Sequence, residues 1–401
     1  MVSVQEAQEL ISQSICSAKA IARPVLDAAG FVLQESVFAA REYPPFDRIT
    51  MDGIGIGYTQ YEEGRRSFVI AGVHGAGSAA PELINVETCF EVMTGSVCPV
   101  GIDCVIPVEL IVVKDGVATI VDESTQISRG WNIHPQGSDC PAGTVLLKPG
   151  LLLNATSIAV AASEGKSLVK VSQLPRVAVV SSGDELVDLD QEPKPWQIRR
   201  SNSYAMASQL KEMNLAEVEI FHLDDDKDEI RQGVETILEE FDVVIMSGAV
   251  SKGKFDYIPE VLEELKVNKL FHCVTQRPGK PFWFGVSEQG KAVFALPGNP
   301  VSAVTGFRRY IVPALLQYLG RQPLTRKANL KGGFSFKKAM TYFLPVCVNF
   351  EGAVLTASAH AVNGSGDFSS LSGSDGFLEL PAEQTVFENG FTADFYPWNE
   401  A

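Results

Sequence analysis

The chain has 401 residues, of which 45% are hydrophobic and 20% charged, and its formal net charge is −16 at pH 7. This composition is that of a soluble globular protein with two to four domains, and the acidic balance disfavours nucleic acid as a partner, because phosphate contacts need a basic face. No apolar run approaches the roughly 18 residues that cross a bilayer and the chain starts without a secretion signal, so we expect a cytoplasmic protein with no membrane partner.

Residues 1–40, together with residues 148–174, predict a small helical and extended domain. The pattern Ser3-x-x-Glu6 is a capping box, and the apolar positions after it keep one face of a helix over 3–20. A further short helix is expected over 155–165, where a Thr-Ser pair precedes the apolar positions and a glycine follows them.

Residues 175–322 alternate between apolar, strand-like runs and amphipathic, helix-like runs. Such alternation predicts an α/β domain whose parallel sheet is covered on both faces. The predicted strands are 176–180, 218–222, 243–246 and 293–296, and the predicted helices are 203–213, 226–241, 257–265 and 301–318. Short β segments with Gly, Pro and Asn turns occupy 41–147 and 323–401, which we interpret as a β-rich domain and a small C-terminal β domain. The predicted fold class is therefore multidomain, α+β and α/β.

Two loops in the α/β domain have the composition of anion-binding turns. Each follows a buried strand, contains small residues and leads into a helix, so backbone N–H groups point outward. Because both loops lie at carboxyl ends of parallel strands, they predict one site for a phosphate-bearing ligand. The candidate binding residues are Ser247, Gly248, Ser251 and Gly253 in the first loop, and Pro297, Gly298, Asn299, Pro300 and Ser302 in the second. The alternative for the second loop is a strand-to-helix turn with Asn299 as cap and Pro300 as first helical residue.

Two acidic residues are candidate metal ligands. Glu185 follows the strand 176–180, and Asp256 follows the first glycine-containing loop. Carboxylates at these places would hold Mg²⁺ through oxygen atoms, and a metal there would bridge phosphates. The alternative for each residue is a structural acid at the start of a helix, and for Asp256 this means the cap of the helix 257–265.

Arg277 and Lys280 place positive charge on a loop that two prolines and a glycine stiffen. A rigid loop with two cations suits an oxyanion, and an acidic protein needs such a local basic patch to bind an anionic substrate. The alternative is a turn whose charges face water. In the β-rich domain Asp52, Thr94 and Asp139 lie on turns, and ordinary turn chemistry is the simpler interpretation of each one alone.

These motifs occur together and in order along the chain. They are Pro-Pro-Phe-Asp, Met-Asp-Gly, Met-Thr-Gly, Gly-x-Asp, Ser-x-Gly-Asp-Glu-Leu, Ser-Gly-x-Val-Ser-x-Gly-x-x-Asp-Tyr, Pro-Gly-Lys-Pro and Leu-Pro-Gly-Asn-Pro-Val-Ser. The ordered set resembles the molybdopterin molybdenumtransferase family, which includes MoeA and the gephyrin E domain, over almost the whole chain.

The resemblance implies an enzyme that inserts molybdenum from molybdate into adenylylated molybdopterin, with Mg²⁺ as cofactor and AMP as a product. It implies that residues 175–322 bind molybdopterin. It also implies a homodimer, in which 1–40 plus 148–174 form the dimerisation domain and the active cleft combines the α/β domain of one subunit with the β-rich domain of the other.

By motif match, the resemblance also assigns roles to single residues of this chain. Glu185 and Asp256 would be the acids of the cleft, and Arg277 and Lys280 would hold phosphate or molybdate. Pro297 and Pro300 would shape the wall of the cleft, and the β-rich domain would contribute Asp52, Thr94 and Asp139 from across the dimer.

The chain departs from the family pattern at several positions. Ala249 replaces the second glycine of Gly-Gly-Val-Ser, and Arg277 stands where lysine is common. Arginine keeps the charge but not the point-charge geometry of lysine. Arg200 stands where an acidic residue is usual, and it therefore reverses a charge next to the predicted site.

Two other functions stay open from the sequence. One is a non-catalytic molybdopterin-binding or scaffold protein on the same fold, which the presence of Glu185, Asp256 and Lys280 disfavours. The other is an adenylyltransferase that activates the pterin itself. Because the chain carries a single α/β domain, we expect that step to belong to a separate protein.

Overall fold

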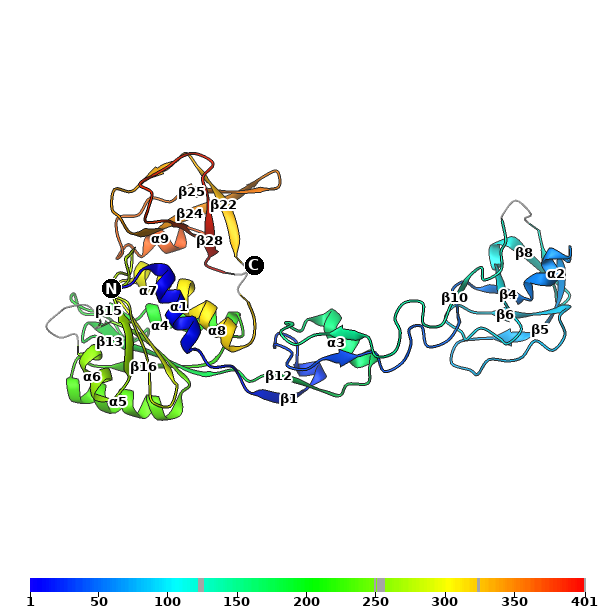
Figure 1. Cartoon of the computed structure of the whole chain (residues 1–401), viewed down its shortest axis with the longest axis horizontal. Coiled ribbons are helices and arrows are strands. Elements are labelled where there is room, and N and C mark those ends of the chain that lie inside the picture. Colours follow the sequence, from blue (N-terminus) through cyan, green and yellow to red (C-terminus); the bar gives the residue numbers. More distant parts are fainter. Residues whose placement is uncertain (122–125, 249, 251–256, 323–324, 400–401) are drawn as a thin grey trace. The chain divides into compact units, whose positions relative to one another are not determined.

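The structure is a computed structural model that describes residues 1–121, 126–248, 250, 257–322 and 325–399. The chain forms two compact units (Figure 1). The first unit contains Met1–Glu35, Pro149–Ala155 and Leu168–Ala401, and the second contains Ser36–Lys148 and Thr156–Ser167. The finer division into four domains stays a prediction. In the described part of the chain, no helix is both long enough and apolar enough to cross a membrane.

The first helix is shorter than predicted. Helix α1 (Val4–Ser14) begins at the expected capping box, in which the Ser3 hydroxyl accepts from the Glu6 N–H at 3.1 Å and the Glu6 carboxylate accepts from the Ser3 N–H at 2.7 Å. The predicted extension to residue 20 is wrong, because the chain turns extended at Ile15. Strand β1 (Ala20–Pro24) follows and pairs antiparallel with β12 (Leu168–Ser172), so the backbone of Ala20 already belongs to a sheet.

A six-stranded sheet forms the centre of the first unit. Four strands are mutually parallel, as predicted, and their spatial order is β16 (Glu217–Leu223), β13 (Arg176–Ser182), β17 (Val243–Ser247) and β21 (Ala292–Leu296). Two antiparallel strands that the sequence analysis did not predict extend one edge, β20 (Trp283–Val286) and β18 (Asn268–His272). The sheet is therefore mixed, with its parallel strands grouped together.

Alternate residues of each parallel strand face opposite helical layers. Val177 and Val179 pack with α1 and α4 (Asn202–Glu212), while Ala178 and Val180 pack with the other layer, α5 (Lys227–Glu240) and α6 (Ile258–Glu264). Burial on both faces explains why these strands are continuous apolar runs in the sequence. Helix α6 begins after Tyr257, so the cap that was considered for Asp256 belongs instead to Tyr257. Asp256 itself lies outside the described residues.

The predicted single helix 301–318 consists of three segments. Helix α7 (Pro300–Gly306) is followed by a π-helical turn, η3 (Phe307–Ile311), and then by α8 (Val312–Tyr318). Pro313 lies in the first turn of α8 and has no N–H to donate to the carbonyl four residues earlier, where its ring would also clash. A wider turn before the proline relieves this conflict, which is a usual place for π geometry.

The C-terminal part of the first unit is a second six-stranded sheet. Its main strands are β24 (Thr341–Glu351), β25 (Val354–Ala359), β22 (Arg326–Lys331), β28 (Thr392–Pro397) and β26 (Gly376–Leu380). Since β26 pairs with both β28 and β24, these five strands close on themselves. The sixth, β19 (Gln276–Arg277), comes from the α/β part of the chain and pairs parallel with β24. The shorter elements of this unit are η1 (Val25–Asp27), β14 (Leu186–Val187), β15 (Ile198–Arg199), β23 (Phe334–Ser335), α9 (Ser369–Ser372) and β27 (Val386–Phe387).

A largely buried ion pair joins the α/β part to the C-terminal sheet. In η3 the Arg309 Nε lies 2.6 Å from the Glu379 carboxylate on β26, and Arg309 Nη1 donates to the Gln8 side chain of α1 at 2.7 Å. The two charged side chains are 11% and 20% exposed.

Replacing Glu379 with alanine is expected to lower the free energy of unfolding by about 3–5 kcal/mol, because it leaves a buried guanidinium without its counter-charge. Urea unfolding followed by circular dichroism measures the loss. The matched control is Glu351→Ala, which breaks the exposed Lys331–Glu351 pair of the same sheet and should cost less than about 1 kcal/mol. Equal losses of unfolding free energy in the two variants would show that the buried pair stabilises the protein no more than the exposed pair does.

The second unit is β-rich, as predicted. Its six-stranded sheet has the order β7 (Cys104–Pro107), β4 (Gly53–Ile56), β6 (Thr88–Val92), β5 (Ser67–His74), β9 (Val117–Ile120) and β8 (Ile111–Lys114). Ile54, Ile56, Phe68 and Ile106 form the centre of its core. The other elements are β2 (Val37–Phe38), β3 (Arg48–Ile49), α2 (Tyr58–Glu62), η2 (Val108–Leu110), β10 (Ile133–His134), β11 (Val145–Leu147) and α3 (Ala155–Ser163), which starts at Ala155 of the first unit.

Candidate functional site

A cavity of about 870 Å³ opens at the carboxyl ends of the parallel strands, and we call it the strand-end pocket. This is the place where open α/β sheets bind their ligands, and the volume suits a nucleotide-sized molecule. The sequence-predicted residues that line it are Glu185, Ser247, Gly248, Pro297, Gly298, Asn299 and Pro300. The structure therefore brings the described residues of both predicted anion-binding loops to one pocket.

Glycine is required at Gly248, at the end of β17. Its φ is +112°, and a Cβ built there would lie 2.6 Å from the carbonyl oxygen of Ser182 at the end of β13. Backbone therefore approaches backbone across the floor of the pocket, with no room for a side chain. Only glycine at this position allows the two strand ends to approach so closely.

Asn202, at the start of α4, ties the two loops to each other. Its amide nitrogen donates to the Ser247 hydroxyl at 2.9 Å and to the Gly298 carbonyl at 2.7 Å. Within the described ranges, the buried oxygen atoms of the pocket lining that have no hydrogen-bond partner include those of Ser182, Asn202 and Ser203. Buried polar atoms are normally satisfied, so a polar ligand that bonds to them would remove a cost.

Asn202 and Asp225 are among the lining residues that the sequence analysis missed. Asp225 lies after the end of β16, and its N–H donates to the Asp184 carboxylate at 2.9 Å. A usable signal was present in the chain, because Asp224, Asp225 and Asp226 directly follow a predicted strand. Acidic residues after β16 occupy the same edge of the sheet as those after β13.

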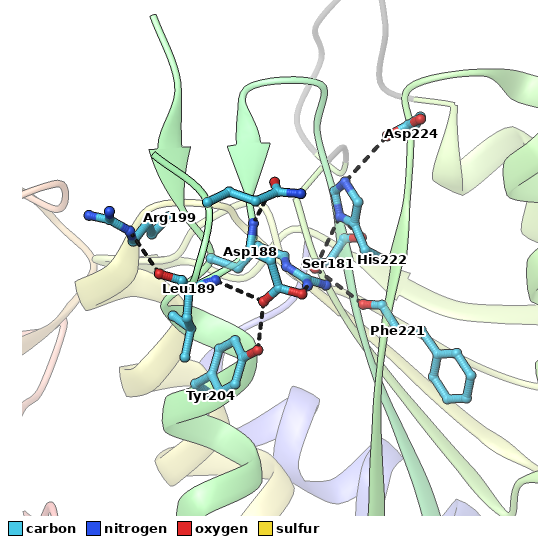
Figure 2. A network of polar contacts seen from close by, with 10 residues as sticks. Ser181, Asp188, Leu189, Arg199, Tyr204, Phe221, His222 and Asp224 are labelled. Carbon is cyan, nitrogen blue, oxygen red and sulfur yellow. Dashed lines mark hydrogen bonds and ion pairs between the residues drawn. The ribbon is translucent and has the colours of Figure 1, made fainter. Parts of the chain in front are cut away.

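Arg200 adds positive charge to the wall of the strand-end pocket. Its Nη2 lies 2.5 Å from the Asp188 carboxylate, and its side chain is only 11% exposed. Figure 2 shows the Tyr204 hydroxyl and the Leu189 N–H directed at the same carboxylate, each at 2.8 Å. The Leu189 and Tyr204 hydrogen bonds, with the Arg200 charge, lower the pKa of Asp188. The carboxyl group therefore stays ionised and holds the arginine in place.

Ser181, His222 and Asp224 form a line of contacts at the neighbouring strand ends (Figure 2). The Ser181 hydroxyl lies 3.3 Å from His222 Nδ1, and His222 Nε2 lies 3.3 Å from the Asp224 carboxylate. The order of residue types is that of a hydrolase triad, but Ser181 is 3% exposed and its hydroxyl donates to the Phe221 carbonyl at 3.2 Å. We interpret this arrangement as a link between β13 and β16 and not as a nucleophile.

A second cavity, of about 580 Å³, adjoins the first, and we call it the cationic pocket. Arg277 and Lys280 line it, together with Ser302 of the second loop and Lys338 of the C-terminal part. The residues that line both cavities are Pro281, Pro297 and Asn299. A ligand can therefore extend from the strand ends to the cations.

Asn299 is at the cap position of α7, as one interpretation of the sequence required, but its side chain makes no capping bond. Its amide instead donates to the Ser365 hydroxyl of the C-terminal part at 3.0 Å. This contact closes one side of the cationic pocket, where Ser365 is also a lining residue.

Three predicted site residues, Ser251, Gly253 and Asp256, lie outside the described residues. The predicted pairing of Asp256 with Glu185 at a metal is therefore a prediction still. Among the residues that are described, no group of three or more His, Cys, Asp or Glu side chains is arranged to hold a metal ion.

The predicted residues of the second unit make local contacts. The Asp52 carboxylate accepts from the Thr94 N–H and from the Thr94 hydroxyl, both at 2.6 Å, so the structure brings these two residues together. The hydroxyl and N–H of Thr94 lower the pKa of Asp52. Asp139 bonds to His134 Nε2 at 2.8 Å. Asp52 is thus kept as an anion on the surface of this unit.

Comparison with known proteins places the chain in a family. Three family models match in order, with the descriptions "MoeA N-terminal region (domain I and II)" for residues 2–165, "Probable molybdopterin binding domain" for 178–317 and "MoeA C-terminal region (domain IV)" for 327–398. A Synechocystis protein named molybdopterin molybdenumtransferase is 40% identical over 400 residues, covering 99% of this chain and 100% of the relative. The chain belongs to the molybdopterin molybdenumtransferase family. The resemblance seen in the ordered motifs is confirmed.

Other members of the molybdopterin molybdenumtransferase family agree over similar lengths. A Staphylococcus aureus protein of that name is 31% identical and covers 98% of this chain and 94% of the relative. The crystal structure of a molybdopterin biosynthesis MoeA protein from Pyrococcus horikoshii superposes with a TM-score of 0.85 at 29% identity, over 100% of both chains. A second structure of the MoeA protein from that organism has a TM-score of 0.82 at 26% identity. The multidomain fold predicted from the sequence is therefore confirmed.

Proposed function

We propose that this chain is a molybdopterin molybdenumtransferase, which inserts molybdate into adenylylated molybdopterin and releases AMP. The observation that carries the proposal is the pair of adjoining cavities. One has glycine turns and carboxylates at strand ends, and the other has the cations Arg277 and Lys280. The scaffold alternative is not favoured, because the relatives carry the name of the transferase.

The adenylylated pterin would occupy the strand-end pocket. The turn after β21 would face its phosphates, as at other strand-to-helix turns, and Arg200 would add a cation to the same wall. Molybdate would occupy the cationic pocket as the second substrate, held by Arg277 and Lys280 on their stiff loop. The shared wall of Pro297 and Asn299 would place the two reactants side by side.

Mg²⁺ fits the donor chemistry of the strand-end pocket. The lining offers carboxylate oxygens from Glu185 and Asp225 and no thiol or imidazole among the described residues, and magnesium needs only one or two carboxylates besides substrate phosphates. Glu185, with Asp256, which precedes α6 in the sequence, would hold the ion. When bound, it would supply neutralisation of the pyrophosphate charge.

We further propose that the protein acts in the cytoplasm as a homodimer, with Asp52, Thr94 and Asp139 reaching the cleft of the other subunit. The adenylylation of the pterin would be done by a separate protein. These statements rest on the family membership and on the motif match described above.

The proposal is tested by measuring AMP release from adenylylated molybdopterin with molybdate and Mg²⁺. The wild-type protein should release AMP only when molybdate is present. Asp256→Asn should lower the rate by about 100-fold and raise the Mg²⁺ concentration needed for half-maximal rate, because the ion loses a charged ligand. Glu260→Gln is the control, since Glu260 is an exposed acid at the start of α6 that pairs with Lys227. A wild-type protein that binds the pterin but releases no AMP would support the scaffold alternative instead.

A further inference from the structure

The loop that carries Arg277 and Lys280 is held from inside by one buried side chain. Gln276 is the first residue of the loop and is 1% exposed. Its amide nitrogen donates to the Gly279 carbonyl at 3.1 Å and to the Pro278 carbonyl at 3.3 Å. The side chain therefore spans the loop and fixes the backbone between the two cations.

The position of the Gln276 amide is itself fixed by Tyr310. The Tyr310 hydroxyl donates to the amide oxygen of Gln276, and the tyrosine is completely buried in η3. The Phe282 ring, just beyond the loop, packs on the Tyr310 ring with the centroids 5.0 Å apart. Burial raises the pKa of Tyr310, so the hydroxyl keeps its proton and remains a donor.

The π-helical turn gives Tyr310 its direction. Within this turn the neighbouring Arg309 reaches Glu379 of the C-terminal sheet, while Tyr310 reaches Gln276 of the loop. The same loop begins as β19, whose Gln276 and Arg277 pair with Thr341 and Tyr342 of β24. One turn of helix is thus bonded both to the C-terminal sheet and to the loop that lines the cationic pocket.

We propose that Tyr310 and Gln276 are positioning residues for the oxyanion substrate, acting through the backbone of the loop that carries Arg277 and Lys280. The inference rests on the proposed function, in which these two cations hold molybdate. Tyr310 is not among the described residues that line either cavity, so it acts on the substrate only through Gln276. The Gln276 amide, which Tyr310 orients, bonds to the carbonyls of Pro278 and Gly279. The side chains of Arg277 and Lys280 are left to line the cavity.

The test compares the kinetics of Tyr310→Phe with those of the wild-type protein in the AMP-release assay. Removing the hydroxyl should raise the KM for molybdate about tenfold, the effect of one lost hydrogen bond on the placement of a binding group. The KM for adenylylated molybdopterin and the kcat at saturating molybdate should change by less than about twofold. Gln276→Met should raise the molybdate KM to at least the same extent. The double variant should be no worse than Gln276→Met alone, because both changes break one chain of contacts.

Tyr318→Phe is the matched control. Tyr318 is on α8 in the same core cluster, but it is not part of the Gln276 contacts, so its variant should keep the wild-type KM for molybdate. If Tyr310→Phe lowers only the melting temperature and kcat while the molybdate KM is unchanged, Tyr310 has a structural function alone and the inference is wrong.

A Lys280→Ala arm separates the inference from the proposed function. If Lys280→Ala raises the molybdate KM and Tyr310→Phe does not, the inference fails while the proposed function survives. If neither variant changes the molybdate KM, the assignment of molybdate to this loop fails, and the inference fails with it. The expected result is a higher molybdate KM in both Lys280→Ala and Tyr310→Phe, with the wild-type KM in Tyr318→Phe.

Discussion

Gly248→Ala is expected to reduce AMP release by about 100-fold or more while leaving the protein folded. The alanine Cβ would lie 2.6 Å from the Ser182 carbonyl oxygen, and the residue would have to keep a φ of +112°. The loop must move to relieve this contact, and the movement separates the strand ends that form the floor of the pocket. Binding of AMP, followed by calorimetry, should weaken in parallel with the rate.

The control for Gly248 is Gly352→Ala, in the turn between β24 and β25. Gly352 also has a positive φ, +65°, but a Cβ there would meet nothing within 4 Å. This variant should lose some stability and keep its activity. Wild-type AMP release by Gly248→Ala would contradict the assignment of the strand-end pocket.

Lys280→Ala is expected to raise the KM for molybdate by about 100-fold, because a charge-assisted hydrogen bond to the oxyanion is lost. The fold of the loop should survive, since Lys280 contributes to it through its backbone carbonyl, which accepts from the N–H groups of Val274 and Phe282 at 2.9 Å each. The measurement is the molybdate dependence of AMP release at saturating adenylylated molybdopterin.

Lys327→Ala is the matched control for this charge. Lys327 is an exposed cation that pairs with Asp394 on the C-terminal sheet, and its removal should leave the molybdate KM unchanged. A rise of similar size in both variants would indicate a long-range effect of net charge and would remove Lys280 from the site.

The parallel part of the sheet and its binding edge could be predicted from the sequence. Strands such as 243–246 are buried on both faces and are therefore continuous apolar runs. Such a run can be recognised in the sequence without knowing which strands it pairs with. The small residues after them mark the strand ends, and Gly248 and the start of the second loop lie in the pocket at that edge. Glu185 also lies where its position after a strand predicted.

The parts that could not be predicted depend on contacts between distant segments. Strands β18 and β20 are short and pair only at the edge of the sheet, so neither has a pattern of its own. The π turn before Pro313 keeps the apolar periodicity of a helix, and the sequence therefore predicted one continuous helix. Asn202 was missed because its importance comes from two bonds to loops that are far from it in the chain.

The two-residue strand β19 links the cationic pocket to the C-terminal sheet. Arg277 is pinned to Tyr342 by main-chain pairing, and its guanidinium lies 5.9 Å from the centre of the Phe336 ring. A fragment that ended after α8 would keep the carboxyl ends of the parallel strands but would lose β24, the strand that pairs with Arg277. In the proposed function, loss of the C-terminal sheet would therefore also weaken the binding of molybdate at Arg277.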